Sequence, residues 1–545
     1  MTDPAKPPEP YGTAEPAGPA RTDPGDWQRL DPRNKPVAVL FIAGPPVVVG
    51  LLWLVGGAFI PPGLLWTITS LGVTGVVIGV VAAVEWVTVR YRVTGEWLQV
   101  RTGFAVRNHR SIPRDRIRSV DISASPLHRV FGLATVKVGT GQHVGSGNEE
   151  LKLDGVSPAE AERLRAVLLY RTAPAVAEEA AAEPEERAVA RLDWAWLRYA
   201  PLTMSSLLAV FGALGVLYKP LDAMGVKPAD IVRLGVVRGA VGEFRSVPLW
   251  LSIAVLVLAV ALVAVLGAVL LFVVTWYGFR LDDEGTTLRT RRGLLTTRSV
   301  TLEKRRLRGV ELAEPLLLRA GGGARLNVVA VGLSTGKGES DRDKDSNARA
   351  LLPPAPRAEA HRVAVRVLGG DPTADVVLRP HPRAARRRRI NRAVLTTLAV
   401  ALALAVLGVW WLPAWAWVCA LVLLPALLPL SFDAYRSLGH GVTGRYLVTR
   451  SGTGIRRTAG LRRDGVIGWT LSRSPFQRRA GLVTLTATTA ANDGAYKVRD
   501  VDPATALRFA EEAVPGILAP FVADPSGRVD ATKPDLGLAA QREDN

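Results

Sequence analysis

Apolar and polar segments alternate along the 545-residue chain in a unit that occurs three times. Each unit begins with two long apolar runs and continues with a basic, strand-rich polar segment. A period of this size reflects a repeated structural unit, so it defines the architecture before any single motif does. The paired runs lie at 37–59 and 64–87, 198–218 and 248–274, and 393–412 and 414–432.

The apolar runs are long enough to cross a lipid bilayer. Each is close to the ~20 residues that span a hydrocarbon core of ~30 Å, and the run at 248–274 is the clearest. Very short turns join the first pair and the third pair, which are therefore predicted to be helical hairpins. Core helices of a large soluble protein are the alternative, and the length, low charge and strict pairing of the runs disfavour it. We expect six spanning helices, with all polar segments on one side.

Basic residues predict that this side is the cytoplasm. Arg90 and Arg92 directly follow the second run, and the segment from Arg386 to Arg392 (RRRRINR) directly precedes the fifth. Lys and Arg flank membrane helices mainly on the cytoplasmic side. The loop at 219–247 also carries basic residues, and we interpret it as an amphipathic piece on the outer surface. The chain is thus predicted to be a multi-pass cell-membrane protein with both termini and the polar segments cytoplasmic.

Each polar segment has the pattern of an antiparallel β module that ends in a helix. Short alternating strands are separated by turns that contain glycine, such as Gly95, Gly285 and Gly452. A Pro-apolar-basic motif and a further strand follow. The closing helix of the first module has Ser157 as its N-cap and Pro158 at its first position. The fold class is therefore α-helical transmembrane hairpins plus three antiparallel sheet or barrel modules, each with a C-terminal helix.

This pattern divides the chain into ten segments. The first five are a disordered Pro-rich tail at 1–36, a hairpin at 37–87, a module at 88–172, a linker at 173–193 and a second hairpin at 194–275. The rest are a second module at 276–370 with a charged loop at 334–350, a basic linker at 371–390, a third hairpin at 391–432, a third module at 433–518 and a disordered tail at 519–545.

Composition narrows the function classes. The formal net charge is +19, but the charge is spread over membrane-flanked modules, which disfavours nucleic acid as a partner. The single cysteine, Cys419, lies in an apolar run, so no internal disulfide or cysteine metal site is expected. The histidines lack ligand spacing, and the GLSTGK segment at 332–337 departs from a phosphate-binding loop. We therefore expect no catalytic residue, no metal and no cofactor. The near absence of ionisable residues in the spans also counts against transport.

Basic clusters near the membrane are the remaining candidate site. In the first module Arg114, Arg116 and Arg118 alternate, and we expect them to share one strand face. The corresponding residues are Lys304, Arg305, Arg306 and Arg308 in the second module and Arg462 and Arg463 in the third. A basic residue near an anionic leaflet contributes ~1 kcal/mol, and a cluster accumulates it. These residues are candidates for contact with anionic lipid headgroups or an acidic partner. The alternative, a positive-inside bias with solvated strand faces, remains open.

The module sequences resemble a known family. The stretch from Ser111 to Val138 (SIPRDRIRSVDISASPLHRVFGLATVKV) carries the resemblance best. The second module keeps LEKRRLRGVELAEPLL, whereas the third has lost the Pro–Arg part and keeps SPFQRRAGL. A sheet of this size with a C-terminal helix resembles the pleckstrin-homology (PH) fold. Its pairing with two membrane helices resembles the bacterial membrane-flanked domain, also called the bacterial PH-like domain. The resemblance implies a role in cell-envelope integrity or resistance to membrane-directed toxins.

These observations lead to one functional hypothesis and two alternatives. The hypothesis is a non-enzymatic membrane scaffold whose PH-like modules bind protein partners or anionic headgroups at the cytoplasmic surface. The alternatives are a six-helix channel or transporter, and an accessory subunit of another membrane complex.

Overall fold

The computed structural model describes residues 27–56, 62–103, 108–117, 119–139, 151–169, 188–203, 248–331, 349–410, 413–491 and 494–519. They belong to two compact units. The first unit contains chiefly residues 1–193 and 205–306, and the second contains 194–204, 307–331 and 335–545. The border between the units therefore falls inside the second predicted module.

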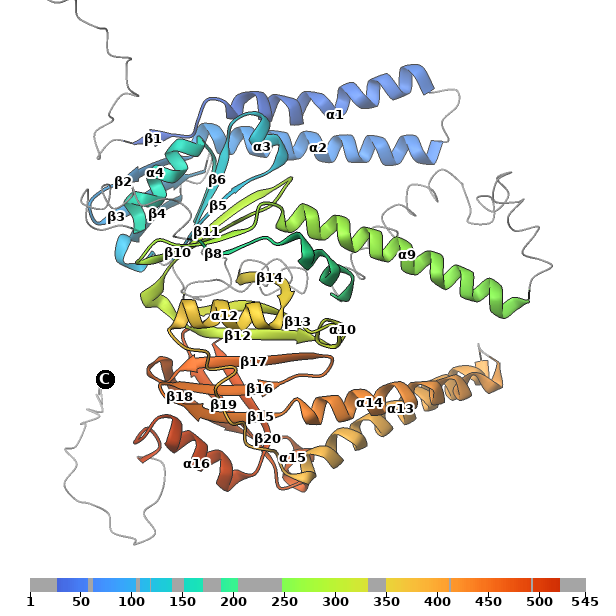
Figure 1. Cartoon of the computed structure of the whole chain (residues 1–545). Coiled ribbons are helices and arrows are strands. Elements are labelled where there is room, and N and C mark those ends of the chain that lie inside the picture. Colours follow the sequence, from blue (N-terminus) through green and yellow to red (C-terminus); the bar gives the residue numbers. More distant parts are fainter. Residues whose placement is uncertain are drawn as a thin grey trace, which may run out of the picture. The chain divides into compact units, whose positions relative to one another are not determined.

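Among its described residues the first unit contains three long apolar helices. Helices α1 (Asn34–Gly56) and α2 (Pro62–Thr88) pack side by side as a hairpin, and α9 (Leu249–Trp276) carries no charged residue (Figure 1). Leucine and valine side chains cover their outer surfaces, and Leu54 is 84% exposed. Such surfaces are unfavourable in water and are typical of helices in contact with lipid.

The described strands of the first unit form two antiparallel sheets. The smaller one has the order β1-β2-β3-β4, formed by Gln28–Arg29, Arg90–Val93, Trp97–Thr102 and Asn108–Pro113. The larger one has the order β7-β6-β5-β11-β10-β9-β8. Its strands are β5 (Ser119–Ala124), β6 (Ala134–Gly139), β7 (Leu151–Val156), β8 (Ala188–Arg191), β9 (Arg280–Asp283), β10 (Thr287–Arg292) and β11 (Thr297–Glu303).

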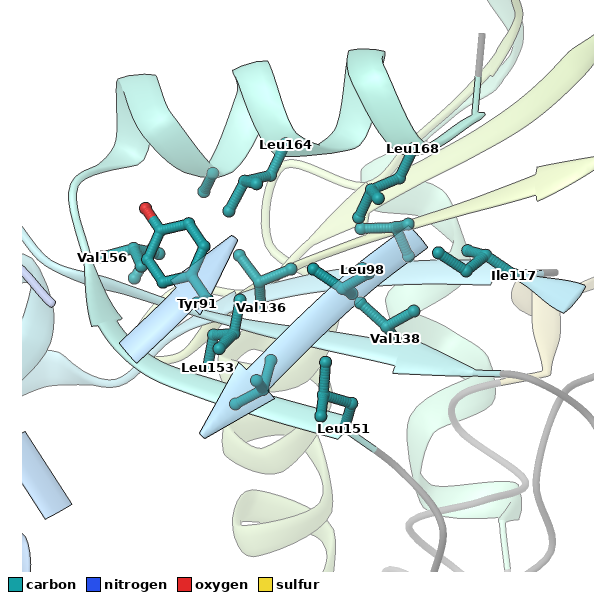
Figure 2. Packing of buried hydrophobic residues seen from close by; sticks show 14 of the residues in the cluster. Tyr91, Leu98, Ile117, Val136, Val138, Leu151, Leu153, Val156, Leu164 and Leu168 are labelled. Carbon is teal, nitrogen blue, oxygen red and sulfur yellow. The ribbon is translucent and has the colours of Figure 1, made fainter. Parts of the chain in front are cut away.

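Helix α4 (Pro158–Leu169) closes the core of the first module. The Ser157 hydroxyl accepts a hydrogen bond from the Glu160 amide at 3.2 Å, which is the N-cap that the sequence predicts. Figure 2 shows Leu164 and Leu168 of this helix directed at Leu98 and Val136 on the strands. Burial of these aliphatic side chains is the main source of the module's stability.

The second unit has the same kinds of elements. A six-stranded sheet has the order β14-β13-β12-β17-β16-β15, and a three-stranded sheet has the order β18-β19-β20. The strands are β12 (Leu307–Pro315), β13 (Gly323–Ala330), β14 (Ala350–Pro356), β15 (Gly439–Thr443), β16 (Tyr446–Ser451), β17 (Ile455–Arg462), β18 (Val466–Ser472), β19 (Val483–Thr489) and β20 (Ala495–Val501). Helices α12 (Arg357–Leu368) and α16 (Pro503–Ala513) follow β14 and β20.

The membrane hairpin of the second unit consists of one long helix and one composite helix. Helix α13 (Arg383–Trp410) packs beside the 3-10 segment η4 (Ala414–Val422) and α14 (Leu423–Arg436) (Figure 1). In the part of the chain that the structure describes, five helices are long and apolar enough to cross a membrane. The run predicted at 198–218 lies largely outside that part. Its first residues belong to the 3-10 segment η2 (Trp194–Leu202), in which Tyr199 is buried.

Each large sheet combines strands of two consecutive modules. Strand β5 of the first predicted module pairs with β11 of the second, and β12 of the second pairs with β17 of the third. Both pairings are antiparallel. The repeat in the sequence is therefore not the unit of sheet formation.

Three predicted segment borders differ from the structure. Strand β1 lies inside the tail predicted at 1–36 and pairs with β2, and β8 lies inside the linker predicted at 173–193 and pairs with β9. Both strands are too short for a periodic pattern to reveal them. Helix α13 begins at Arg383, inside the basic linker predicted at 371–390, because its basic first turns pack on a module rather than on lipid. The piece at 219–247 and nearly all of the loop at 334–350 lie outside the described residues.

Candidate membrane-surface site

The Pro-apolar-basic motif forms a short helix in each module: α3 (Pro126–Val130), α10 (Leu316–Ala320) and α15 (Pro475–Arg479). In α15 the Ser474 hydroxyl accepts from the Gln477 amide, and the Gln477 side chain accepts from the Ser474 amide. In α3 Ser125 accepts from the His128 amide in the same way. Proline at the first helical position fixes the backbone for these turns.

Each short helix lies beside the base of a membrane helix. Arg319 of α10 forms an ion pair with Asp433 of α14. Arg129 of α3 donates to the Leu294 carbonyl, and the Leu294 amide donates at 2.9 Å to the Val274 carbonyl of α9. Ala480, directly after α15, packs with Ala384 and Ala385 at the start of α13. The motif therefore marks the end of each module that is nearest to the membrane helices.

A buried carboxylate fixes α15 to α13. Asp500 is 2% exposed and accepts from Arg388 Nη1 at 2.6 Å, Arg389 Nη2 at 3.0 Å and Gln477 Nε2 at 2.9 Å. Its backbone has a φ of 60°, which is uncommon for a residue other than glycine. Two hydrogen bonds from arginine and one from the neutral Gln477 amide compensate the burial of this charge. Arg388 and Arg389 therefore hold the module, whereas Arg386 and Arg387 of the same run are exposed.

The short helices present apolar and basic side chains to the outside. Phe476 of α15 is 63% exposed and stands between the exposed residues Arg473, Arg478 and Arg479. Val130 of α3 is 79% exposed, and Leu316 and Leu317 of α10 are also exposed. An apolar tip flanked by arginine suits the boundary between headgroups and acyl chains. The motif is visible in the sequence, but the pattern of apolar and polar residues within it does not indicate which residues are exposed.

The predicted shared strand face for Arg114 and Arg116 is wrong, because residues 114–116 form the 3-10 turn η1 (Arg114–Arg116) between β4 and β5. Arg118 lies outside the described residues. The equivalent turns are η3 (Lys304–Arg306) and η5 (Arg463–Gly465). The basic residues occur together because the chain turns there, and they do not form one strand face.

The first residue of each turn connects elements within its own module. Arg114 donates to the carbonyls of Gly95, at 2.7 Å, and Val167. Arg463 donates to the carbonyls of Gly444, Glu512 and Ala513, so it stabilises both a hairpin turn and the last turn of α16. Lys304 forms an ion pair with Asp283 at 2.6 Å. These contacts give the three positions a structural role.

Most of the other predicted basic residues also have acidic partners. Arg305 and Arg306 pair with Glu303, and Arg308 and Arg462 pair with Asp464. Arg116 is exposed, and no partner for it is found among the described residues. Of the predicted residues that the structure describes, Arg116 and Arg305 present their charge to solvent most freely.

A basic hollow lies at the base of α2. Its volume is about 670 Å³, and Val87, Thr88, Arg90, Arg101 and His109 are among its lining residues. The guanidinium of Arg101 lies over the Trp27 ring at 4.0 Å from the centroid, which orients it by a cation–π contact. The hollow combines the end of an apolar helix with cationic side chains, a composition that favours an anionic amphiphile.

No group of three or more His, Cys, Asp or Glu side chains with metal-binding geometry occurs among the described residues.

Comparison with known proteins identifies the class to which this fold belongs. The family model described as "Bacterial PH domain" matches three times, at residues 46–172, 233–369 and 393–512, and the chain therefore belongs to this family. The three matches confirm the resemblance that the sequence motifs carry.

One relative is a transmembrane protein of Bacillus subtilis. The chain is 22% identical over 428 residues to the UPF0699 transmembrane protein YdbT, across 76% of this chain and 82% of that protein. No solved structure matches the chain. The family, the transmembrane relative and the apolar helices together make this chain a membrane protein with antiparallel PH-like modules.

Proposed function

We propose that the chain is a non-enzymatic membrane scaffold with six spans, whose PH-like modules lie on the cytoplasmic surface and contact anionic lipid headgroups through their short helices. One observation carries this proposal. Phe476 is exposed among three arginines on α15, and Asp500 fixes that helix to the base of α13. An apolar side chain in this position gains free energy by entering the interface, and the arginines gain by meeting phosphate.

The basic hollow at α2 supports the same function in the first unit. Arg90, Arg101 and His109 line a space that the end of a membrane helix also lines. The phosphate of a lipid bound there would lie beside these basic side chains, and the acyl chains of that lipid would lie along α2. Protein partners at the same surface are part of this proposal, and they are suggested by the three sheet modules that membrane helices tether at one surface.

Depth-dependent fluorescence quenching tests the headgroup contact. We replace Cys419 by alanine, introduce Phe476→Cys, label it with an environment-sensitive dye and reconstitute the full chain in nanodiscs with lipid-borne nitroxide quenchers. Quenching is expected in bilayers that contain phosphatidylglycerol, and it should weaken in pure phosphatidylcholine or when Arg478 and Arg479 are changed to glutamine. Leu507→Cys, an exposed position on α16, is the matched control. Equal quenching at both positions in every lipid would refute the proposal.

Orientation has a separate test. A fluorescent protein fused after Asn545 should be fluorescent in bacterial cells, and a fused periplasmic alkaline phosphatase should be inactive. The opposite pair of results would contradict a cytoplasmic location of the modules.

A further inference from the structure

The two joints between modules use the same strand register. Aligned on the 3-10 turns, Leu302 of β11 corresponds to Leu461 of β17, because each lies two residues before its turn. Ser119 of β5 and Gly309 of β12 each lie three residues after their turn. Leu302 pairs with Ser119 in the first joint, and Leu461 pairs with Gly309 in the second.

An ion pair occupies the same place in both joints. Arg298 of β11 pairs with Asp121 of β5, with Nε 2.8 Å from Oδ2. Arg457 of β17, the counterpart of Arg298, lies 3.9 Å from Glu311 of β12, the counterpart of Asp121. The joint is therefore a repeated interface with a defined register and a defined charge pair.

Two strands that correspond to the strands of these joints lie at sheet edges and have no neighbour on one side among the described strands. Strand β4, the counterpart of β11 and β17, pairs only with β3. Strand β18, the counterpart of β5 and β12, pairs only with β19. Leu471 of β18 is 41% exposed, whereas its counterpart Leu312 at the occupied joint is 1% exposed. Exposed sheet edges with apolar side chains are sites for further strand pairing.

We infer that β18 of one copy of this chain pairs with β4 of a second copy in the register of the internal joints. This register places Ile112 opposite Gly468, Arg110 opposite Thr470 and Asn108 opposite Ser472. Trp469 then lies opposite Ser111, a small residue like Thr301 and Gly460 at the internal joints. The counterparts of the ion pair are Asn108 and Thr470, so both charges of the internal pair are absent at these two edges.

The inferred contact is head-to-tail, because the two surfaces that meet are different. Such a contact generates a ring when the rotation closes and an open row when it does not. The occupant is a second copy and not an unrelated protein, since the chain itself supplies both halves of an interface that it already forms twice.

Disulfide trapping between two full-length chains tests the register. One chain carries Cys419→Ala and Arg110→Cys, and the other carries Cys419→Ala and Thr470→Cys. Directly opposite residues in an antiparallel pair lie within disulfide range, whereas diagonal ones at ~7–8 Å do not. After reconstitution together in liposomes and mild oxidation, a reducible dimer is expected from this mixture. Arg110→Cys mixed with Ser472→Cys is the off-register control and should give little dimer.

A charge cycle gives a second readout without cysteine chemistry. Asn108→Arg and Thr470→Asp together recreate the internal ion pair, and Asn108→Asp with Thr470→Lys recreates it reversed. Each double variant should self-associate about two- to fivefold more tightly than the corresponding single variants, measured by energy transfer between labelled chains in liposomes. Both positions are exposed, so we expect these changes to leave the fold intact.

Three results would overturn the inference. They are a folded chain that stays monomeric at every lipid-to-protein ratio, a dimer that traps equally well out of register, and a monomer in which β18 is protected from hydrogen exchange. The third result would indicate that another segment of the same chain covers the edge.

Discussion

Arg298 on β11 and Asp121 on β5 form an ion pair across the border between two sequence repeats, with Nε 2.8 Å from the carboxylate. Both side chains are partly buried, and the strands that carry them pair directly. The joint between modules is thus held by backbone hydrogen bonds and by a specific charge interaction.

Reversing one charge of this pair should destabilise the first unit. Arg298→Asp places two acids together, and we expect a loss of about 1–3 kcal/mol because charge-assisted bonds in partly buried sites are in that range. Asp121→Arg added to Arg298→Asp should recover most of it. Thermal unfolding in detergent micelles measures the effect. If the double variant were no more stable than Arg298→Asp alone, the pair would contribute nothing specific.

Replacing Asp500 should be the most damaging single change near the membrane. Asp500→Ala leaves the buried Arg389 without its carboxylate, and loss of one partner of a buried pair costs about 3–5 kcal/mol. Limited proteolysis of the reconstituted chain should show cleavage near α15. Arg386→Ala, an exposed neighbour on α13, is the control and should change stability by under about 0.5 kcal/mol.

Substitutions of the arginines in the basic turns should differ in their effect on stability, because some of these residues have a structural role and others lie on the surface. Arg463→Ala removes bonds to three carbonyls, of which Glu512 O at 2.7 Å is the best defined, and should cost about 1.5–3 kcal/mol. Arg116→Ala should leave the unfolding temperature unchanged. A comparable loss for both variants, measured by thermal unfolding at matched lipid content, would contradict the contacts described for Arg463.

Acid should destabilise the second unit through a buried histidine pair. The His381 and His440 rings lie 5.0 Å apart and are both buried. Burial lowers the pKa of His381 from 6.5 to about 3, helped by His440, Arg389 and Arg450. Burial likewise lowers the pKa of His440 to about 4, with Arg379 acting in the same direction and Glu512 opposing it.

These lowered pKa values determine the direction in which pH changes the stability. The unfolded chain takes up protons below pH 6.5 and the folded chain does not, so stability is complete above pH 6.5 and falls towards pH 4. Each histidine contributes a slope of about 1.4 kcal/mol per pH unit. His440→Gln should flatten the decline of the unfolding temperature between pH 6.5 and 4, and the exposed His109→Gln should not. A pH-independent wild type would refute the assignment.

Much of the architecture could be predicted from the sequence because it rests on long-period signals. The apolar runs, the β modules and the N-cap at Ser157 depend on local composition, and the described residues contain long apolar helices at five of the six predicted runs, together with the β modules and that N-cap. The strand pairing between modules could not be predicted, since every module carries similar strands and their order is decided by edges that meet in space. One sequence feature did indicate the pairing, because Arg298 and Arg457 lie at the same distance along the chain before their 3-10 turns.

The candidate site likewise has features that could be predicted from the sequence and features that could not. The Pro-apolar-basic motif was visible, but the exposure of Phe476 depends on how α15 packs. The role of Asp500 could not be predicted, because Arg389 precedes it by more than a hundred residues. The alternation of Arg114 and Arg116 was misleading, since a 3-10 turn removes the two-residue periodicity of a strand.

The sharing of sheets across repeats affects how this protein can be divided. A truncation at the borders of a sequence repeat would separate β5 from β11 or β12 from β17. The strand edges left without a partner would promote aggregation. Gene fragments intended for expression should therefore keep the strands on both sides of a joint together. The same constraint limits evolution, because loss or shuffling of one repeat would require its neighbours to pair anew.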